Sequence, residues 1–281
     1  MQFNNPKTES RELIPGLGHG FSEVDGWLPL VEQPLLILVG LTGVGKSTLV
    51  NALSDQGLNF TLLPNRRTLT DQFIIPTVME IDGVAQEKDI TCRVTRFQYT
   101  RRYKQLFPAG MVQVLSQLQI DPSQLTFPLL FDGLRGEQEL KYATTMLPKA
   151  QFVVLEAPNR VRFERLLTRQ DSFDSIGKFS PVNYNTNENQ ISSFAQLGVP
   201  EAINLFSPQE TTDILTQLNQ GYYSLTDLCD RLKIIVEEQK NYDPLAARVF
   251  LETLSGSRTL FIDTTVDTPD FIAQKVMSFL S

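Results

Sequence analysis

The 281-residue sequence has very few of the side chains that bind transition metals or form crosslinks. It contains one histidine, His19, and two cysteines, Cys92 and Cys229, and neither cysteine belongs to a Cys-x-x-Cys pair. Structural zinc sites take four ligands, largely from these two residue types. We therefore expect no zinc centre, two reduced cysteines that serve only packing, and a structural role for His19.

Long apolar runs and excess positive charge are also absent. The longest aliphatic run near the central motif, Leu35–Val39, is too short to cross a bilayer, and the N-terminus lacks a charged start followed by an apolar run. The net charge is −7, whereas nucleic acids and anionic membranes attract basic surfaces. We expect a cytoplasmic protein whose partners include neither a membrane nor a nucleic acid.

Short apolar runs recur along the chain, and helical patterns lie between or after them. The apolar runs are Leu35–Val39, Phe60–Leu63, Pro128–Phe131, Phe152–Leu155 and Thr259–Ile262. The helical patterns are Lys46–Leu53, Glu137–Leu147, Val161–Gln170 and Pro269–Leu280. This alternation predicts an α/β fold in which helices cover both faces of a parallel sheet. Such sheets bind ligands beyond the C-terminal ends of their strands.

Two stretches do not follow this alternation. Residues 1–33 are polar and rich in turns, and we interpret them as an N-terminal extension with a short helix near Phe21–Leu28. The second stretch, 171–257, interrupts the α/β core, which then consists of residues 34–170 and 258–281.

The interrupting stretch carries several signals of helix starts. Ser207-Pro208-Gln209-Glu210 is a capping box with proline at the first helical position, and Ser224 and Asp243-Pro244 mark two further starts. These signals predict an all-helical insertion over residues 171–257.

One motif carries a specific chemistry. Gly40-Leu41-Thr42-Gly43-Val44-Gly45-Lys46-Ser47 matches G-x-x-x-x-G-K-[ST] in full, and a predicted strand precedes it and a helix follows it. The glycines let main-chain amides surround a phosphate, at which the following helix also points its positive end. We expect Lys46 to reach the β and γ phosphates of ATP or GTP and Ser47 to bind Mg²⁺, with Thr48 completing the site.

Polar residues after the third apolar run are further candidates. Asp132 ends that run and suits a role as a second Mg²⁺ ligand or as acceptor of a proton from an attacking hydroxyl, whereas a turn residue is the alternative. Arg135 follows three positions later, and its planar guanidinium suits a phosphate.

The helical pattern Val161–Gln170 has an arginine-rich face. Arg162, Arg165 and Arg169 fall within a wedge of about 60°, while Phe163, Leu166 and Leu167 form an apolar face that we expect to pack on the sheet. Neighbouring guanidiniums repel one another unless an anion lies between them, and a triphosphate would supply that anion. A solvated charged face is the alternative.

Two other basic segments are candidates for acceptor binding. Arg66 and Arg67 follow the second apolar run, and a basic cluster comprises Arg93, Arg96, Arg101, Arg102 and Lys104. Surface arginines and a solvated helix face are the respective alternatives.

Taken together, these motifs resemble the nucleoside-monophosphate kinase group of P-loop proteins. The resemblance rests on Gly40–Thr48, Phe131–Arg135 and Glu156–Arg169, and the last two look closest to the archaeal-type kinases similar to dephospho-coenzyme A kinase. It implies a five-stranded parallel sheet, ATP as donor, and lid arginines, Arg165 and Arg169, that contact the transferring phosphate. The acceptor-binding motifs of adenylate and guanylate kinases are missing, and residues 171–257 replace the short lid.

The leading hypothesis is thus an ATP-dependent kinase acting on a small phosphorylated or hydroxylated acceptor. Catalysis would rest on Lys46, Asp132, Arg135, Arg165 and Arg169. One alternative is a GTP-binding switch, although Asp132 lacks the glycine three positions later that such switches need, and Thr168-Arg169-Gln170-Asp171 only imitates their guanine motif. Another is a nucleotide-binding regulator without phosphate transfer, with residues 171–257 binding a partner protein.

Overall fold

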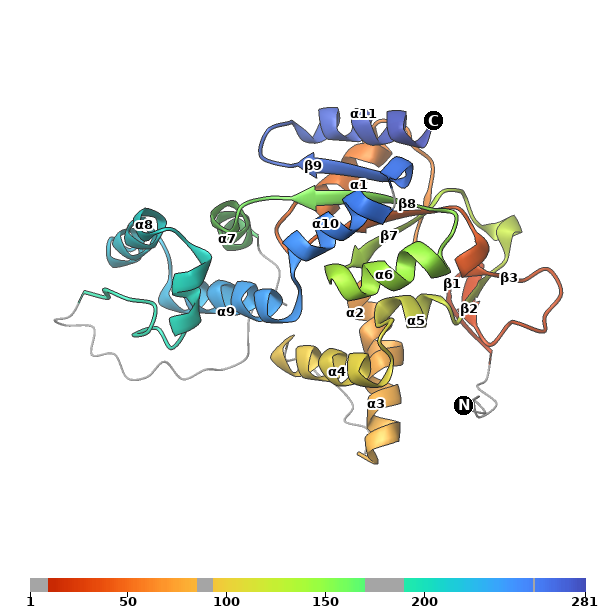
Figure 1. Cartoon of the computed structure of the whole chain (residues 1–281), viewed down its shortest axis with the longest axis horizontal. Coiled ribbons are helices and arrows are strands. Elements are labelled where there is room, and N and C mark those ends of the chain that lie inside the picture. The colour runs from red at the N-terminus through yellow and green to blue at the C-terminus, as the bar shows by residue number, and fades with distance from the viewer. Residues whose placement is uncertain (1–9, 85–92, 170–189, 255) are drawn as a thin grey trace.

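The computed structural model describes residues 10–84, 93–169, 190–254 and 256–281. Its centre is a parallel sheet with the strand order β5-β7-β4-β8-β9, shown in Figure 1. The strands are β4 (Leu35–Val39), β5 (Thr61–Leu62), β7 (Leu129–Leu134), β8 (Ala150–Glu156) and β9 (Thr259–Asp263). Each predicted apolar run contributes one strand, which confirms the α/β fold and the five-stranded sheet.

The central strand β4 is buried on both faces. Leu35, Ile37 and Val39 pack in one apolar cluster, and Leu36 and Leu38 pack in the other. Successive side chains of a strand point to opposite faces, so an unbroken aliphatic run is what a doubly covered strand needs.

Helices cover both faces of the sheet, as predicted (Figure 1). The first face carries α1 (Lys46–Asp55) and α11 (Pro269–Leu280). The second carries α5 (Met111–Leu115), α6 (Gly136–Met146) and α10 (Pro244–Leu254). The loop from β4 to α1 therefore lies at the middle of the sheet's C-terminal edge, where ligands of this fold class bind.

The N-terminal residues form part of a second, antiparallel sheet with the order β1-β2-β6-β3. Its strands are β1 (Arg11–Ile14), β2 (Leu17–His19), β3 (Leu28–Pro29) and β6 (Leu118–Ile120). The expected helix near Phe21–Leu28 is wrong. Instead, Phe21 stacks on Trp27 across a turn, with ring centroids 3.9 Å apart, and the chain then enters β3.

Between β5 and β6 the chain forms helices at the opposite end of the molecule from α11 (Figure 1). They are α2 (Arg66–Leu69), the π-helix η2 (Thr70–Ile74), α3 (Ile75–Asp82) and α4 (Arg93–Leu106). Short 3₁₀ helices lie at η1 (Leu30–Glu32), η3 (Pro122–Gln124) and η6 (Gly256–Arg258). Pro76, the second residue of α3, lacks an amide hydrogen and lies two positions after the π-helix, which suits a wider turn at this point.

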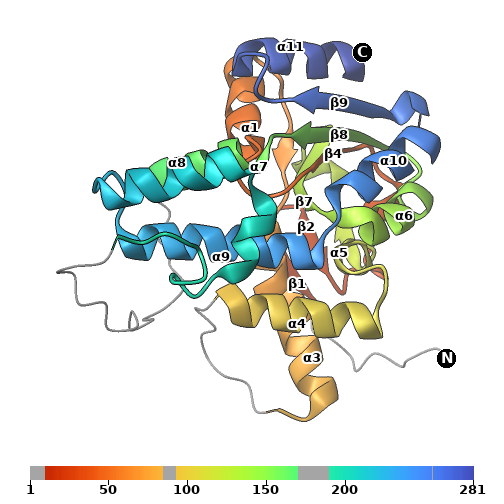
Figure 2. The same cartoon turned by 60° about the vertical axis from the view of Figure 1, so that its left-hand side comes forward.

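The predicted additional helices are present in the described part of 171–257. They comprise η5 (Pro200–Leu205), α8 (Pro208–Asn219), α9 (Leu225–Asn241) and α10. The Ser207–Glu210 capping box forms with both of its hydrogen bonds, and Ser224 caps α9. Figure 2 shows α8 and α9 beside α7 (Asn159–Thr168), away from the sheet.

The apolar face of α7 packs on these helices and not on the sheet, so that expectation was wrong. Phe163 and Leu166 belong to a cluster built mainly from η5, α8 and α9. The Phe163 ring meets Phe206 and Tyr223 edge-on, at centroid distances of 5.8 and 6.1 Å. The amphipathic α8 and α9 need an apolar partner, and α7 supplies it.

None of the helices in the described ranges has an apolar stretch of the length that a bilayer crossing requires. Cys229 is a free, half-buried thiol, and burial raises its pKa. Cys92 lies outside the described residues.

Candidate active site

The loop between β4 and α1 adopts a backbone that favours glycine. Gly40, Gly43 and Gly45 have φ angles of +149°, +87° and +100°. A Cβ atom on Gly40 would lie 2.7 Å from the carbonyl oxygen of Leu155, and one on Gly43 would lie 2.9 Å from that of Arg162. The loop is thus packed tightly against β8 and α7, leaving its amides to surround a ligand.

Lys46 is held in position by this loop. Its Nζ donates hydrogen bonds to the carbonyl oxygens of Gly40 and Leu41, at 2.8 and 3.0 Å. An ammonium group has three donors, so one remains for a phosphate oxygen. Burial lowers the pKa of Lys46 to about 7, an effect that Arg135 and Arg162 strengthen and that Asp132 and Glu238 oppose. A bound phosphate would favour the charged ammonium.

Asp132 lies at an irregularity in the sheet. The register between β4 and β7 shifts after Phe131, so Asp132 and Gly133 form a bulge. A Cβ on Gly133 would be 2.4 Å from the ring of Phe131, which explains the glycine. Bulges re-aim side chains, and Asp132 is half-buried at the wall of the cavity that Ser47 also lines.

The oxygen atoms of Ser47 and Asp132 suit a magnesium ion. Mg²⁺ prefers hard oxygen ligands and usually retains water and substrate phosphates in its shell. Within the described ranges no group of three or more His, Cys, Asp or Glu side chains could hold a metal by itself. A magnesium ion bound at Ser47 and Asp132 would therefore take its remaining ligands from phosphates and water.

A cavity of about 860 Å³ opens over the loop. It is lined by all five residues that the sequence suggested for catalysis: Lys46, Asp132, Arg135, Arg165 and Arg169. They come from three separate segments, namely the start of α1, the end of β7 and the last turn of α7 with its C-cap. The volume falls in the range of small-molecule sites.

Arg162 and Arg165 of α7 differ in their surroundings. Arg165 donates to the main-chain oxygen of Thr264 at 2.9 Å and to that of Gly43 at 3.3 Å, so it joins the phosphate-binding loop to the end of β9. Arg162 does not line the cavity over the loop, and its side chain is only 2% exposed.

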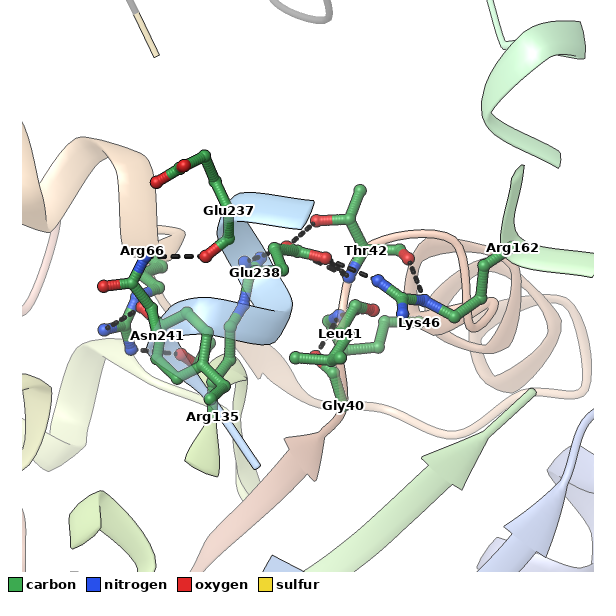
Figure 3. Close-up of polar contacts among 12 residues, drawn as sticks. Gly40, Leu41, Thr42, Lys46, Arg66, Arg135, Arg162, Glu237, Glu238 and Asn241 are labelled. Carbon is green, nitrogen blue, oxygen red and sulfur yellow. Dashed lines mark hydrogen bonds and ion pairs between the residues drawn. The ribbon is translucent and has the colours of Figure 1, made fainter. Parts of the chain in front are cut away.

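The sequence suggested a triphosphate as the anion between Arg162, Arg165 and Arg169, but the anion bound to Arg162 is a side chain of the protein, which Arg162 shares with Arg135 (Figure 3). Glu238 of α9 is fully buried and accepts from Arg162 Nη2 at 2.6 Å and from Arg135 Nη1 at 2.5 Å. It also accepts from the amide of Thr42 at 3.1 Å and from its hydroxyl.

Sequence reasoning missed Glu238, although a signal was present. Ile234, Ile235 and Glu238 are all buried on α9, three or four positions apart. A carboxylate at helical spacing from apolar core positions must have a charged or hydrogen-bonded partner. Arg162 and Arg135, whose own partners the sequence did not identify, were candidates for that role.

Five of the other basic candidates form ion pairs: Arg66, Arg96, Arg101, Arg102 and Lys104. Arg66 binds the buried carboxylate of Glu139 through both terminal nitrogens, at 2.7 and 2.6 Å, and Lys104 lies 3.3 Å from it. The basic cluster is similarly paired: Arg96 with Asp71, Arg101 with Glu237, and Arg102 with Asp82. Arg66, Arg67 and Arg96 nevertheless line the cavity on the side away from α11.

A family model described as an AAA domain matches residues 36–189. No curated protein matches the chain. Among solved structures, an unliganded sugar kinase from a Janibacter species matches 88% of this chain and 94% of its own, with 13% identity and a TM-score of 0.33, which marks only a loose likeness in shape. Because the family match takes in the phosphate-binding loop and more than half of the chain, the protein belongs to the AAA-domain family of P-loop nucleotide-binding proteins.

Proposed function

We propose that the protein is an ATP-dependent phosphotransferase that acts on a small phosphorylated or hydroxylated acceptor. The observation that carries the proposal is the convergence of Lys46, Arg135, Arg165 and Arg169 on one cavity with Asp132 at its wall. Phosphoryl transfer depends mainly on positioning and charge neutralisation, and cations supplied from several segments serve both.

Each residue has a role in this proposal. The amides of the loop and the free donor of Lys46 hold the β and γ phosphates, and Ser47 and Asp132 hold Mg²⁺, which neutralises phosphate charge when bound. Arg135, Arg165 and Arg169, which line the cavity, would contact the transferring phosphate. The alternative role of Asp132 is to accept a proton from an acceptor hydroxyl.

The part of the cavity that α2 and α4 line supplies the acceptor site. Arg67 and Arg96 line it together with the aromatic rings of Phe97 and Tyr242. Cations beside rings suit an acceptor that combines a planar or apolar part with an anionic group. In this proposal the protein is a cytoplasmic kinase that resembles the dephospho-coenzyme A kinase-like group, and residues 171–257 are an insertion in its lid position.

Transfer of labelled γ-phosphate from ATP to a panel of nucleotides, coenzyme precursors and sugars tests the proposal. We expect at least one acceptor to become labelled, with ATP preferred to GTP. Slow hydrolysis that no acceptor accelerates would refute phosphotransfer, and tighter binding of GTP than of ATP would favour a switch.

A further inference from the structure

The insertion delivers a buried negative charge to the phosphate-binding loop. The carboxylate of Glu238 is 0% exposed and is bound by two guanidiniums, one amide and one hydroxyl (Figure 3). A buried carboxylate costs several kcal/mol of desolvation, which strong partners must offset. An apolar side chain would fill the same space without this cost, so the charge itself calls for an explanation.

The contacts of Glu238 fix one limb of the loop. The amide of Thr42 donates to Glu238, and the carbonyl oxygen of Thr42 accepts from Arg162 Nε at 2.9 Å. Both peptide groups around Thr42 are thereby held from outside the loop. The Thr42 amide is engaged by Glu238, which leaves a phosphate to the amides that follow it in the loop.

The same carboxylate orients Arg135. One terminal nitrogen of Arg135 is tied to Glu238, its side chain is 15% exposed, and it lines the cavity with Lys46. Its Nε atom is buried without a hydrogen-bond partner among the described residues. Arg135, Arg162 and Lys46 are like charges in close proximity, so without Glu238 they would repel one another.

We propose that Glu238 is a positioning residue of the nucleotide site, an inference that rests on the proposed function. Its carboxylate holds the Thr42 limb of the loop and aims Arg135 at the terminal phosphate of a bound nucleoside triphosphate. In this proposal Glu238 does not touch the nucleotide and acts through Thr42, Arg162 and Arg135. The lid-position helices are in this way coupled to triphosphate recognition.

Calorimetric titration with Mg·ATP and Mg·ADP tests this coupling. Glu238→Gln keeps the shape of the side chain and removes its charge, and we expect at least a tenfold loss of ATP affinity with less than a threefold loss for ADP. Glu237→Gln is the matched control, because Glu237 precedes Glu238 in α9 and pairs with Lys240 and Arg101 instead of with the loop. It should change neither affinity by more than twofold.

A double-mutant cycle separates positioning from mere support of the fold. In an Arg135→Ala background, Glu238→Gln should change the ATP-to-ADP affinity ratio by less than twofold, because the guanidinium that Glu238 orients is absent from both proteins. Equal losses for ATP and ADP, independent effects in the cycle, or wild-type behaviour of Glu238→Gln would overturn the inference.

If Glu238→Gln does not fold, Glu238→Asp replaces it. The shorter carboxylate cannot reach both Thr42 and Arg135, so the affinity ratio should fall about threefold, and an unchanged ratio would again overturn the inference. Failure of the wild-type protein to bind ATP at all is a different result, which would refute the proposed function and this inference with it.

Discussion

Single residues set the shape of the phosphate-binding loop, and Gly43 is the clearest case. It combines a φ of +87° with a neighbouring carbonyl oxygen 2.9 Å from where a Cβ atom would lie. Gly57 has nearly the same φ, +86°, but nothing within 4 Å of that position. A comparison of alanine substitutions at these two positions therefore separates the effect of backbone strain from the effect of crowding against α7.

Gly43→Ala should lower the affinity for Mg·ATP at least tenfold, because the loop must move away from Arg162. Gly57→Ala should cost only the strain of a left-handed alanine, about 1–2 kcal/mol of folding free energy, and leave ATP affinity unchanged. Titration calorimetry and urea unfolding of both variants check this. Equal ATP affinities for the two variants would contradict the role of crowding.

The surroundings of Glu139 lead to a quantitative prediction of how the stability of the protein depends on pH. Burial alone would raise the pKa of Glu139, but Arg66 and Lys104 outweigh it and hold this pKa at about 2. The ordinary value is 4.5. A pKa that is lower in the folded than in the unfolded state adds stability above pH 4.5, and this stability is lost as the pH falls toward 2.

Glu139→Gln should therefore destabilise the protein by about 3 kcal/mol at neutral pH, and the difference from wild type should shrink as the pH falls from 5 to 3. Urea unfolding of both proteins over this pH series measures the difference in free energy of unfolding. The contributions of the other carboxylates are common to both proteins and cancel in this difference. A difference that stays constant over the series would show that the ion pair is not the source of the stability.

At the scale of elements, local signals in the sequence located most helices and strands. The run Leu35–Val39 was a strand, and α11 spans the predicted Pro269–Leu280. Capping residues found α8 and α9 because a side chain that caps a helix lies next to it in the chain. The short strands β3 and β6 were missed because their pairing partners are distant in sequence.

The capping box of α8 gives a prediction at this scale. Ser207→Ala removes the hydroxyl that accepts from the amide of Glu210, and it should cost about 1 kcal/mol of folding free energy. Thr216→Ala, at an exposed position within the same helix, should be neutral or slightly stabilising. Thermal unfolding of both variants decides the matter, and a Ser207→Ala variant as stable as wild type would contradict the capping assignment.

At the scale of the whole molecule, the candidate site could be predicted in part. The motif Gly40–Ser47 is contiguous, so its residue types alone identified it. The convergence of Asp132, Arg135 and Arg165 followed from the rule that parallel strands end at one edge. The partner of Arg162 could not be found in this way, because Glu238 lies 76 residues away in α9 and only the packing of α7 on that helix brings them together.

The candidate nucleotide site lies at the C-terminal edge of the parallel sheet, and its loop contacts α7 and Glu238 of α9. Arg135 and Arg162, two of the charged groups beside that loop, form ion pairs within the protein. Lys46 stands out because two of its three donors are fixed by the loop and the third is left for a phosphate. Removal of this side chain should affect nucleotide binding far more than removal of an ordinary surface lysine.

The most direct test of the account is titration calorimetry of the full chain with Mg·ATP and Mg·GTP. The wild-type protein should bind one nucleoside triphosphate, Lys46→Ala should bind it at least tenfold more weakly, and Lys141→Ala, at a half-exposed surface lysine, should match the wild type. A wild-type protein that gives no heat with either nucleotide, or a Lys46→Ala variant that binds as the wild type does, would contradict it.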